Sequence, residues 1–317
     1  MSAGLTVAVT GATGFLGRHV VAALATRGHA VRLLARREPL DGSWGGLVPE
    51  VVLGSLSDRA SLARLVDGAD AVLHLAGAIK ARHDAEFLTV NRDGSRALAE
   101  AAAATASIRH FVHVSSLAAR HPELSGYAAS KRASEDVVFA ALGRDRVSVI
   151  RPPAIYGPGD RETLVFFQLA SRRHVPLPGS ARARISLIHV HEAARLLADC
   201  LSEAPSGQVQ AIADGKADGY GWREILDAAA DAVGNRAPRY FSVPGGLLRG
   251  IGGSVGALAS FFGQSGMVNA GKIRELLHED WSVPEEQLRR SPDGGTGPAL
   301  SAGFAATAVW YRQAGWL

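Results

Sequence analysis

Residues 5–17 read LTVAVTGATGFLG, and this stretch decides the fold of the chain. Its first six residues form a short β-type apolar run, and Gly11, Gly14 and Gly17 follow where a strand would turn into a helix. Glycines in such a turn let backbone N–H groups approach a pyrophosphate, and the N-terminus of the helix adds partial positive charge. We therefore expect a nicotinamide dinucleotide to bind on the turn formed by residues 11–17.

Short apolar runs alternate with helical patterns through the first half of the chain. The expected strands are 5–10, 30–35, 51–53, 71–75, 111–114 and 147–151, and the expected helices are 15–27, 58–66 (capped by Asp58), 91–104 and 127–142. This alternation predicts right-handed crossovers and an α/β fold with a doubly wound parallel sheet. We expect residues 1–160 to form a dinucleotide-binding domain that includes a Tyr/Lys helix. Residues 161–317 would then form a smaller substrate-binding region, with pieces such as 209–213 returning to the main sheet.

The composition is that of a folded globular protein. The chain has 317 residues, of which 47% are hydrophobic and 20% charged, which excludes disorder and fibrous repeats. Cys200 is the single cysteine, so neither an intramolecular disulfide nor a cysteine metal cluster is expected. No group of His, Asp and Glu has metal-ligand spacing, so we expect no metal. Because residues 1–10 do not resemble a signal peptide, we expect a cytoplasmic protein.

The charge pattern points to a small anionic ligand. The net charge is +4 and the pI about 9.5, but the basic residues are scattered, so no nucleic-acid partner is expected. No charged residue occurs between Arg249 and Lys272, a stretch that contains seven glycines. These glycines favour a core-facing helix with a loop over a membrane span. A peripheral membrane contact or a dimer surface through residues 250–271 remains the alternative.

Tyr127 and Lys131 stand four residues apart, on one face of the expected helix. A tyrosine hydroxyl ordinarily titrates at about pH 10, and a neighbouring ammonium favours the phenolate, which suits the group to proton transfer. Ser115 and Ser116 end the strand before this helix. The glycine turn, the serine pair and the Tyr/Lys pair together indicate redox chemistry on a carbonyl or alcohol.

These motifs resemble those of an extended short-chain dehydrogenase/reductase of the NAD(P)-dependent epimerase/dehydratase type. The matching segments, in family order over about the first 190 residues, are 10–17 (TGATGFLG), 74–77 (HLAG), 90–91 (VN), 114–116 (VSS), 127–131 (YAASK), 151–159 (RPPAIYGPG) and 188–190 (IHV). The resemblance implies that Ser116 bonds the substrate oxygen, that Tyr127 transfers the proton, and that Lys131 holds the nicotinamide ribose. It favours Ser116 over Ser115 for this role.

The resemblance also implies a set of cofactor contacts. They are Gly11, Thr13, Gly14, Phe15, Leu16, Gly17, Arg36, Arg37, Ser55, Leu56, Leu75, Ala76, Gly77, Asn91, Tyr127, Lys131, Pro152 and Ile155. Ser55 stands where the family usually has Asp, and His191 replaces another common Asp. The second strand ends in Arg36 and Arg37 with no acid before Glu38, which favours NADP over NAD. The alternative is that these arginines tolerate both cofactors.

Three departures from the family bear on the reaction. Leu117 and Ala118 replace the Asp-Glu pair of sugar-nucleotide dehydratases, and Ser116 lies only eleven residues before Tyr127. Ile185 stands where the family has a diphosphate-binding arginine. We therefore expect reduction of a carbonyl, or oxidation of an alcohol, on a small and hydrophobic substrate, since residues 166–167, 261–262 and 267 are apolar. A nucleotide-sugar epimerase and a non-catalytic regulatory protein are the alternatives. The family suggests a homodimer formed through helices 91–104 and 127–142.

Overall fold

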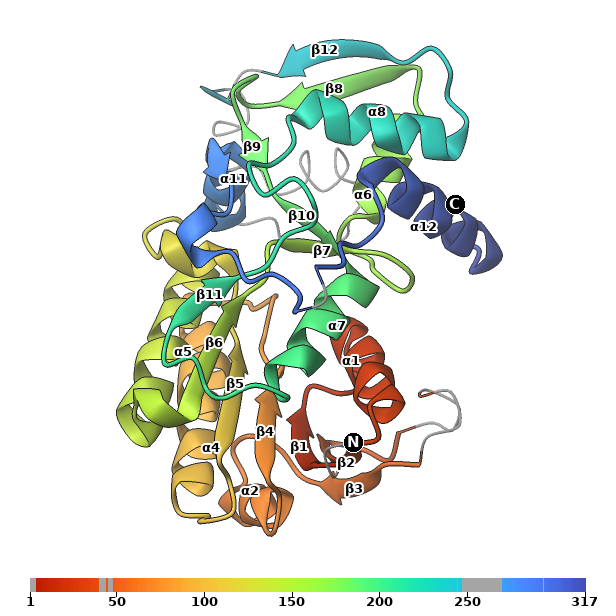
Figure 1. Cartoon of the computed structure of the whole chain (residues 1–317). Helices are drawn as coiled ribbons and strands as arrows, with labels where there is room; N and C mark the ends of the chain where they lie inside the picture. Colours follow the sequence, from red (N-terminus) through yellow and green to blue (C-terminus); the bar gives the residue numbers. More distant parts are fainter. Residues whose placement is uncertain (1–3, 40–43, 45–47, 244, 247–269, 293) are drawn as a thin grey trace. The chain divides into compact units, whose positions relative to one another are not determined.

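The structure is a computed structural model that describes residues 4–39, 44, 48–243, 245–246, 270–292 and 294–317 (Figure 1). The chain divides into two compact units. Unit 1 comprises Met1–Pro152, Ala193–Ile212 and Arg289–Gly294, and unit 2 comprises Pro153–Glu192, Ala213–Leu288 and Gly295–Leu317.

Unit 1 is built on one parallel sheet. Its strands, among the described residues, are β1 (Thr6–Thr10), β2 (Ala30–Ala35), β3 (Glu50–Leu53), β4 (Ala71–His74), β5 (His110–Val114), β6 (Val147–Arg151) and β11 (Val209–Ala211). They lie in the order β3-β2-β1-β4-β5-β6-β11 and every pairing is parallel. β4, β5 and β6 are buried along their whole length because helices cover both faces of the sheet. The predicted doubly wound α/β fold is confirmed.

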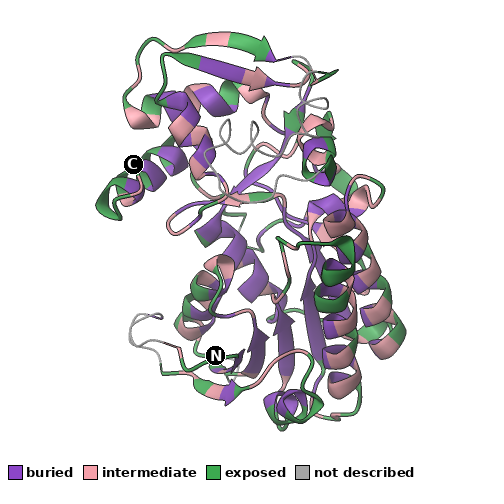
Figure 2. Ribbon diagram, turned by 180° about the vertical axis from the view of Figure 1, so that it is seen from behind, coloured by how far each residue is buried: buried purple, intermediate pink, exposed green. Residues whose placement is uncertain are grey.

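Helices pack on both faces of this sheet (Figures 1 and 2). One face is covered by α2 (Arg59–Val66), α4 (Gly94–Ala103) and α5 (Gly126–Leu142), and the other by α1 (Phe15–Thr26) and the part of α7 (Val190–Cys200) that belongs to unit 1. α2 begins where expected, because the Asp58 carboxylate accepts a hydrogen bond from the Ala60 N–H at 3.0 Å.

The expected helix 91–104 differs from prediction at its start. The chain forms α3 (Asp84–Phe87), then a π-helical turn, η1 (Leu88–Asp93), and only then α4. The wider turn contains Asn91. Its side-chain amide accepts a hydrogen bond from the Ala78 N–H and donates one to the Ala78 carbonyl. Such π turns are frequent at functional sites.

Unit 2 contains three short parallel strand pairs among its described residues. They are β7 (Ala154–Tyr156) with β10 (Leu187–His189), β8 (His174–Pro178) with β12 (Arg239–Val243), and β9 (Arg184–Ile185) with β13 (Asp280–Trp281). Its helices include α6 (Leu164–Ala170), α8 (Trp222–Val233), α11 (Ala270–Leu277) and α12 (Leu300–Gln313). Tyr156, Phe167, Phe304 and Tyr311 are fully buried and form an aromatic core.

The apolar stretch singled out in the sequence falls mostly outside the described residues. Residues 250–269, which include Phe261, Phe262 and Met267, belong to the part that the structure does not describe. In the part that it does describe, no helix is both long and apolar enough to cross a membrane.

Two buried histidines lie side by side in the sheet. His74 on β4 and His113 on β5 are in register, and their rings stack with centroids 5.3 Å apart. His74 Nδ1 shares a hydrogen bond with Thr10 Oγ1 (2.6 Å). Burial, followed by the nearby charge of Lys131, lowers the pKa of His74 to about 3 and that of His113 well below 6.5. Both rings are therefore neutral in the folded protein at physiological pH.

This neutrality predicts acid sensitivity. In the unfolded chain these histidines bind protons below pH 6.5, the ordinary value, whereas the folded protein keeps them neutral. The free energy of unfolding should therefore fall as pH drops below 6.5, by up to about 1.4 kcal/mol per pH unit for each histidine. Urea unfolding between pH 7 and 5 measures this slope. His113→Asn should reduce the slope by the amount that corresponds to uptake of about one proton on unfolding. His83→Asn, at an exposed position, should leave the slope unchanged. Equal slopes in all three proteins would contradict the conclusion that His113 is neutral in the folded protein.

Candidate active site

The turn after β1 and the loop after β4 meet at the carboxyl edge of the sheet. Gly11 has φ of +77°, and a Cβ built on it would lie 2.7 Å from the Ala76 nitrogen. A Cβ on Gly17 would lie 2.1 Å from the Gly11 carbonyl oxygen. Both positions therefore require glycine. β1 and β4 are also the neighbours at which the strand order reverses, which is where dinucleotides bind in this architecture.

This turn offers free backbone donors. Gly14 is the N-cap of α1 and has no side chain with which to cap the helix, so the N–H groups of the first turn are available to a ligand. Thr13, Phe15 and Leu16 lie in the same turn. The described residues thus fit the diphosphate of a dinucleotide, as the sequence predicts.

The next two strands place the residues expected near the adenosine end. Arg36 and Arg37 directly follow β2; both are exposed, and among the described residues neither has a carboxylate partner. Ser55 and Leu56 follow β3, where Ser55 Oγ lies 2.9 Å from Ser57 Oγ and Leu56 packs against α4. These residues lie at the carboxyl edge of the sheet, and their cofactor contacts stay predictions.

Ser116 and the Lys131 ammonium lie at the carboxyl end of β5, and the Tyr127 ring packs edge-on against Phe87, with ring centroids 5.9 Å apart. Ser116 follows the strand, and its Oγ accepts a hydrogen bond from the Ala118 N–H at 3.2 Å. Tyr127 and Lys131 lie in the first two turns of α5. Lys131 Nζ donates to the carbonyl of Val114, two residues before Ser116, at 2.8 Å. The structure therefore brings the ammonium of Lys131 to the strand end that carries Ser116.

Asn91 joins the β4 loop to the Tyr/Lys helix. Its Oδ1 accepts from the Ala78 N–H at 2.7 Å, and its Nδ2 donates to Ser130 Oγ, next to Lys131, at 2.8 Å. A Cβ on Gly77 would lie 3.0 Å from Asn91 Oδ1 and 3.8 Å from Lys131 Nζ. Gly77, Asn91 and Lys131, all expected to contact the cofactor, thus lie together.

Three predicted contacts remain. The Leu75 N–H donates to the Thr10 carbonyl at 3.1 Å, so Leu75 adjoins the glycine turn, and the other two residues lie in different units. The Pro152 carbonyl accepts from the Leu117 N–H at 2.8 Å, so Pro152 adjoins the loop that carries Ser116. Ile155 lies in β7 of unit 2. Its role at the cofactor stays a prediction.

Sequence reasoning missed a buried network behind these residues. The Glu135 carboxylate accepts two hydrogen bonds from the Arg151 guanidinium, at 2.7 and 2.6 Å, and one from Ser115 Oγ at 2.5 Å. The side chains of Glu135 and Arg151 are only 2% and 8% exposed. One signal was available: Glu135 lies one helical turn after Lys131. Its partner on β6 could not be inferred from this spacing.

The network affects the charge of Lys131. Complete burial lowers the pKa of the Lys131 ammonium to about 8, and the negative charge of Glu135 opposes this effect. The neutral rings of His74 and His113 also lie close enough to feel the charge of Lys131, and Arg151 is paired with Glu135. A protonated Lys131 near Tyr127 and Ser116 makes the site suited to proton transfer to a substrate oxygen.

Comparison with known proteins supplies the family context. The model of the NAD-dependent epimerase/dehydratase family matches residues 7–213. A protein of Caulobacter vibrioides named ceramide reductase is 46% identical over 312 residues, which are 98% of this chain and 96% of the relative. A ketoreductase of Stigmatella aurantiaca, named for a 3-oxo-4-farnesyl-dihydroquinoline oxide, is 32% identical over 65% of this chain and 67% of its own length. The solved structure of gox2253 shares the fold, with a TM-score of 0.77, 21% identity and 99% of both chains covered.

Removal of the Glu135 charge should change the pH dependence of the enzyme. Because that charge raises the pKa of Lys131, Glu135→Gln should move the alkaline limb of kcat/KM to lower pH. Asp136→Asn, next to it but exposed on the same helix, is the matched control and should leave the profile in place. If both variants keep the wild-type profile, Glu135 only supports the fold.

Proposed function

Because this chain belongs to the NAD-dependent epimerase/dehydratase family, we propose that it is an NADPH-dependent ketoreductase acting on a ceramide-type lipid. The observation that carries the proposal is the 46% identity to the ceramide reductase over almost the full length of both chains. The compound for which the Stigmatella relative is named also has an oxo group and a long hydrocarbon substituent, the farnesyl group. The substrate would be a ketone at the position where ceramide carries its secondary hydroxyl.

The residues near Ser116 support reduction over dehydration. Elimination in sugar-nucleotide dehydratases requires a carboxylate near the reacting carbons, whereas the buried Leu117 and Ala118 follow Ser116 here. Between Ser116 and Tyr127 the single acid is Glu123, whose side chain is 66% exposed. No carboxylate of this interval is therefore buried beside the reactive hydroxyl groups.

The chemistry of the proposed reaction divides between cofactor and protein. A reduced nicotinamide, when bound, supplies the hydride for the carbonyl carbon. Ser116 donates a hydrogen bond to the ketone oxygen, and the Tyr127 hydroxyl gives its proton to that oxygen as the alcohol forms. The Lys131 ammonium stabilises the phenolate that remains on Tyr127. The backbone of residues 11–17 would hold the diphosphate.

Two exposed arginines support NADPH as the preferred cofactor. Arg36 and Arg37 follow β2 and have no carboxylate partner among the described residues. The planar guanidinium fork matches a phosphate, and no acid that would select the free ribose hydroxyls stands among residues 30–37.

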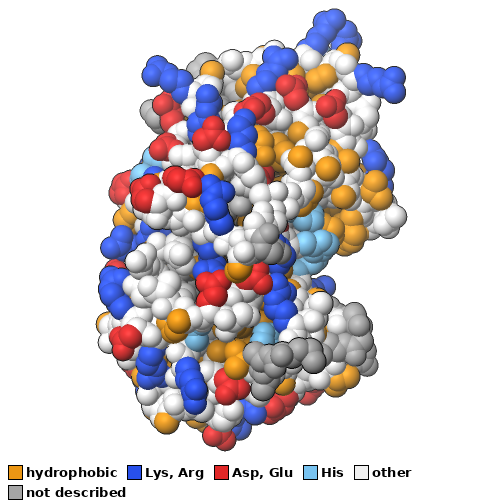
Figure 3. All heavy atoms as spheres, viewed as in Figure 1, with side chains coloured by type: hydrophobic (Ala, Val, Ile, Leu, Met, Phe, Trp, Pro, Cys, Tyr) orange, Lys and Arg blue, Asp and Glu red, His pale blue; other side chains and the backbone are white. Residues whose placement is uncertain are grey.

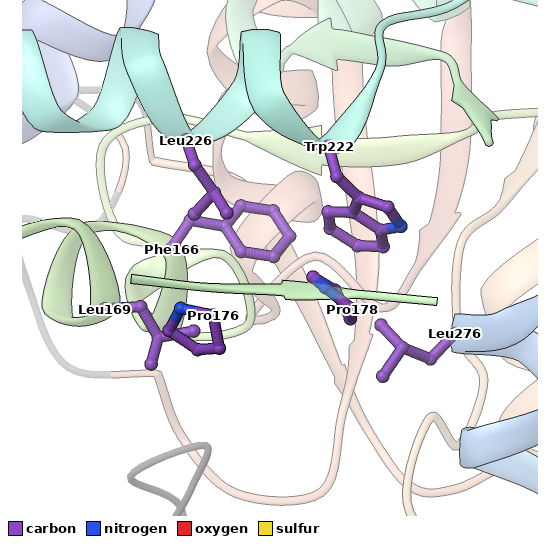
Figure 4. A pocket seen from close by; sticks show the side chains of 7 residues that line it. All are labelled: Phe166, Leu169, Pro176, Pro178, Trp222, Leu226 and Leu276. Carbon is purple, nitrogen blue, oxygen red and sulfur yellow. The ribbon is translucent and has the colours of Figure 1, made fainter. Parts of the chain in front are cut away.

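Unit 2 contains a small apolar hollow between α6, β8, α8 and α11. Figure 4 shows the side chains of Phe166, Trp222, Leu226 and Leu276 that help to line it. It has room for about one water molecule, so it does not hold a lipid chain as it stands. The support for a lipid substrate therefore comes from the named relatives.

The activity should depend on the Tyr127 hydroxyl. With a short-chain ketone analogue of ceramide, wild-type protein should oxidise NADPH, followed by loss of absorbance of the reduced cofactor. Tyr127→Phe should lose about 10²–10⁴-fold in kcat and still bind NADPH, because only the proton donor is removed. Tyr240→Phe, on β12, is the matched control. Turnover of UDP-sugars but not of the ketone would refute the proposal.

Cofactor choice should depend on Arg36. Arg36→Asp places a carboxylate where the proposal puts the 2′-phosphate, so it should weaken NADPH binding by about tenfold or more and leave NADH binding nearly unchanged. Titration of cofactor fluorescence measures both dissociation constants. Equal losses for the two cofactors count against the assignment.

A further inference from the structure

Four arginines cluster at the end of the β8/β12 pair in unit 2 where both strands begin. The Arg239 N–H, at the start of β12, donates to the Arg173 carbonyl at 2.9 Å, just before β8. The Asn235 side-chain amide donates to the carbonyls of Ala170 (2.7 Å) and Arg172 (3.0 Å), which ties the two connecting loops together. The exposed arginines held there, which we call the basic edge, are Arg172, Arg173, Arg236 and Arg239. Figure 3 shows Lys and Arg side chains projecting where these strands begin.

The arginines of the basic edge form no ion pairs with the described residues. Among the described residues, none of its four arginines has a carboxylate partner, although arginines elsewhere pair, as Arg59 does with Glu100 at 3.1 Å. Two acids of α8 lie near β12. Asp227 accepts a hydrogen bond from the Tyr240 hydroxyl at 2.5 Å and pairs with Arg223 at 3.4 Å, and the charge of Asp231 also raises the pKa of Tyr240. Surfaces usually intersperse the two signs of charge, so this edge carries an excess of positive potential.

An aromatic side chain accompanies these charges. Phe241 follows Arg239 by two residues on β12, so the two side chains point to the same face of the strand. Phe241 is 47% exposed. Tyr240 points the other way, where the Arg223 guanidinium lies 4.2 Å from its ring centre. The outer face of β12 therefore displays arginine and phenylalanine together.

From these observations we propose that the basic edge and Phe241 bind the surface of an anionic lipid bilayer. Arginines near such a surface are attracted by its negative potential, and an exposed phenylalanine can enter the boundary between headgroups and acyl chains. The inference rests on the proposed function, because a ceramide-type substrate resides in a bilayer and its reductase must reach it there. A single-stranded nucleic acid is the less suitable partner, since it would require a groove with several stacking aromatics.

Vesicle flotation with the full chain tests this proposal. The protein should float with phosphatidylcholine vesicles that contain phosphatidylglycerol, should stay behind with pure phosphatidylcholine, and should be released by salt. The variant with Arg172, Arg173, Arg236 and Arg239 changed to Gln should bind at least a hundredfold more weakly, at about fivefold per arginine. A matched variant with Arg59, Arg96, Arg109 and Arg132 changed to Gln lowers the net charge equally and should float like wild type. Equal loss in both variants, or wild-type flotation of the first, overturns the proposal.

A second pair of measurements separates this proposal from the proposed function. The basic-edge variant should reduce a water-soluble short-chain ketone at the wild-type rate, but should lose activity on the same ketone embedded in anionic vesicles. Phe241→Ser should weaken flotation while the arginines stay in place. Flotation that persists without any ketone reduction supports the basic edge and refutes the reductase. Binding to a single-stranded oligonucleotide but not to vesicles refutes the basic edge as a membrane contact.

Discussion

The buried carboxylate of Glu135 is the interaction on which the geometry of the candidate site depends. It lies on α5 and is bonded by Arg151 at the end of β6 and by Ser115 at the end of β5. A buried charge of this kind is costly unless its hydrogen bonds are satisfied, and removal of one partner typically costs 3–5 kcal/mol, an order-of-magnitude range. The same contacts therefore hold the helix of Tyr127 and Lys131 against the strand that leads to Ser116.

The site that results is suited to a simple reaction. The Ser116 hydroxyl and the Lys131 ammonium lie at one strand end, Tyr127 lies one helical turn before Lys131 on α5, and buried apolar residues stand where elimination would need carboxylates. The ceramide reductase and the ketoreductase among the relatives carry names that agree with this chemistry. The basic edge proposed for unit 2 suits a substrate that resides in a bilayer, and it rests on residues other than those of the candidate site.

Much of unit 1 could be predicted from the sequence because its signals are local. Gly11 and Gly17 indicate the position of the turn in the sequence, because no larger residue fits at either place. The strands of the sheet can be recognised as continuous apolar runs. The π turn at Leu88–Asp93 could not be predicted, since helical periodicity does not distinguish it from an α-helix. Glu135, on α5, was missed because its role depends on Arg151, a partner sixteen residues away at the end of the strand β6. The strands of unit 2 are short and pair with distant segments, as β8 does with β12, which leaves little periodic signal.

The central claim is that hydride passes to a lipid ketone while Tyr127 supplies the proton. It is tested most directly with NADPH deuterated at C4 of the nicotinamide and a ceramide-type ketone, followed by mass spectrometry of the lipid product. The account predicts one deuterium at the carbon that bears the new hydroxyl, from one of the two C4 faces only. A product without deuterium at that carbon, or no lipid alcohol at all, would contradict it.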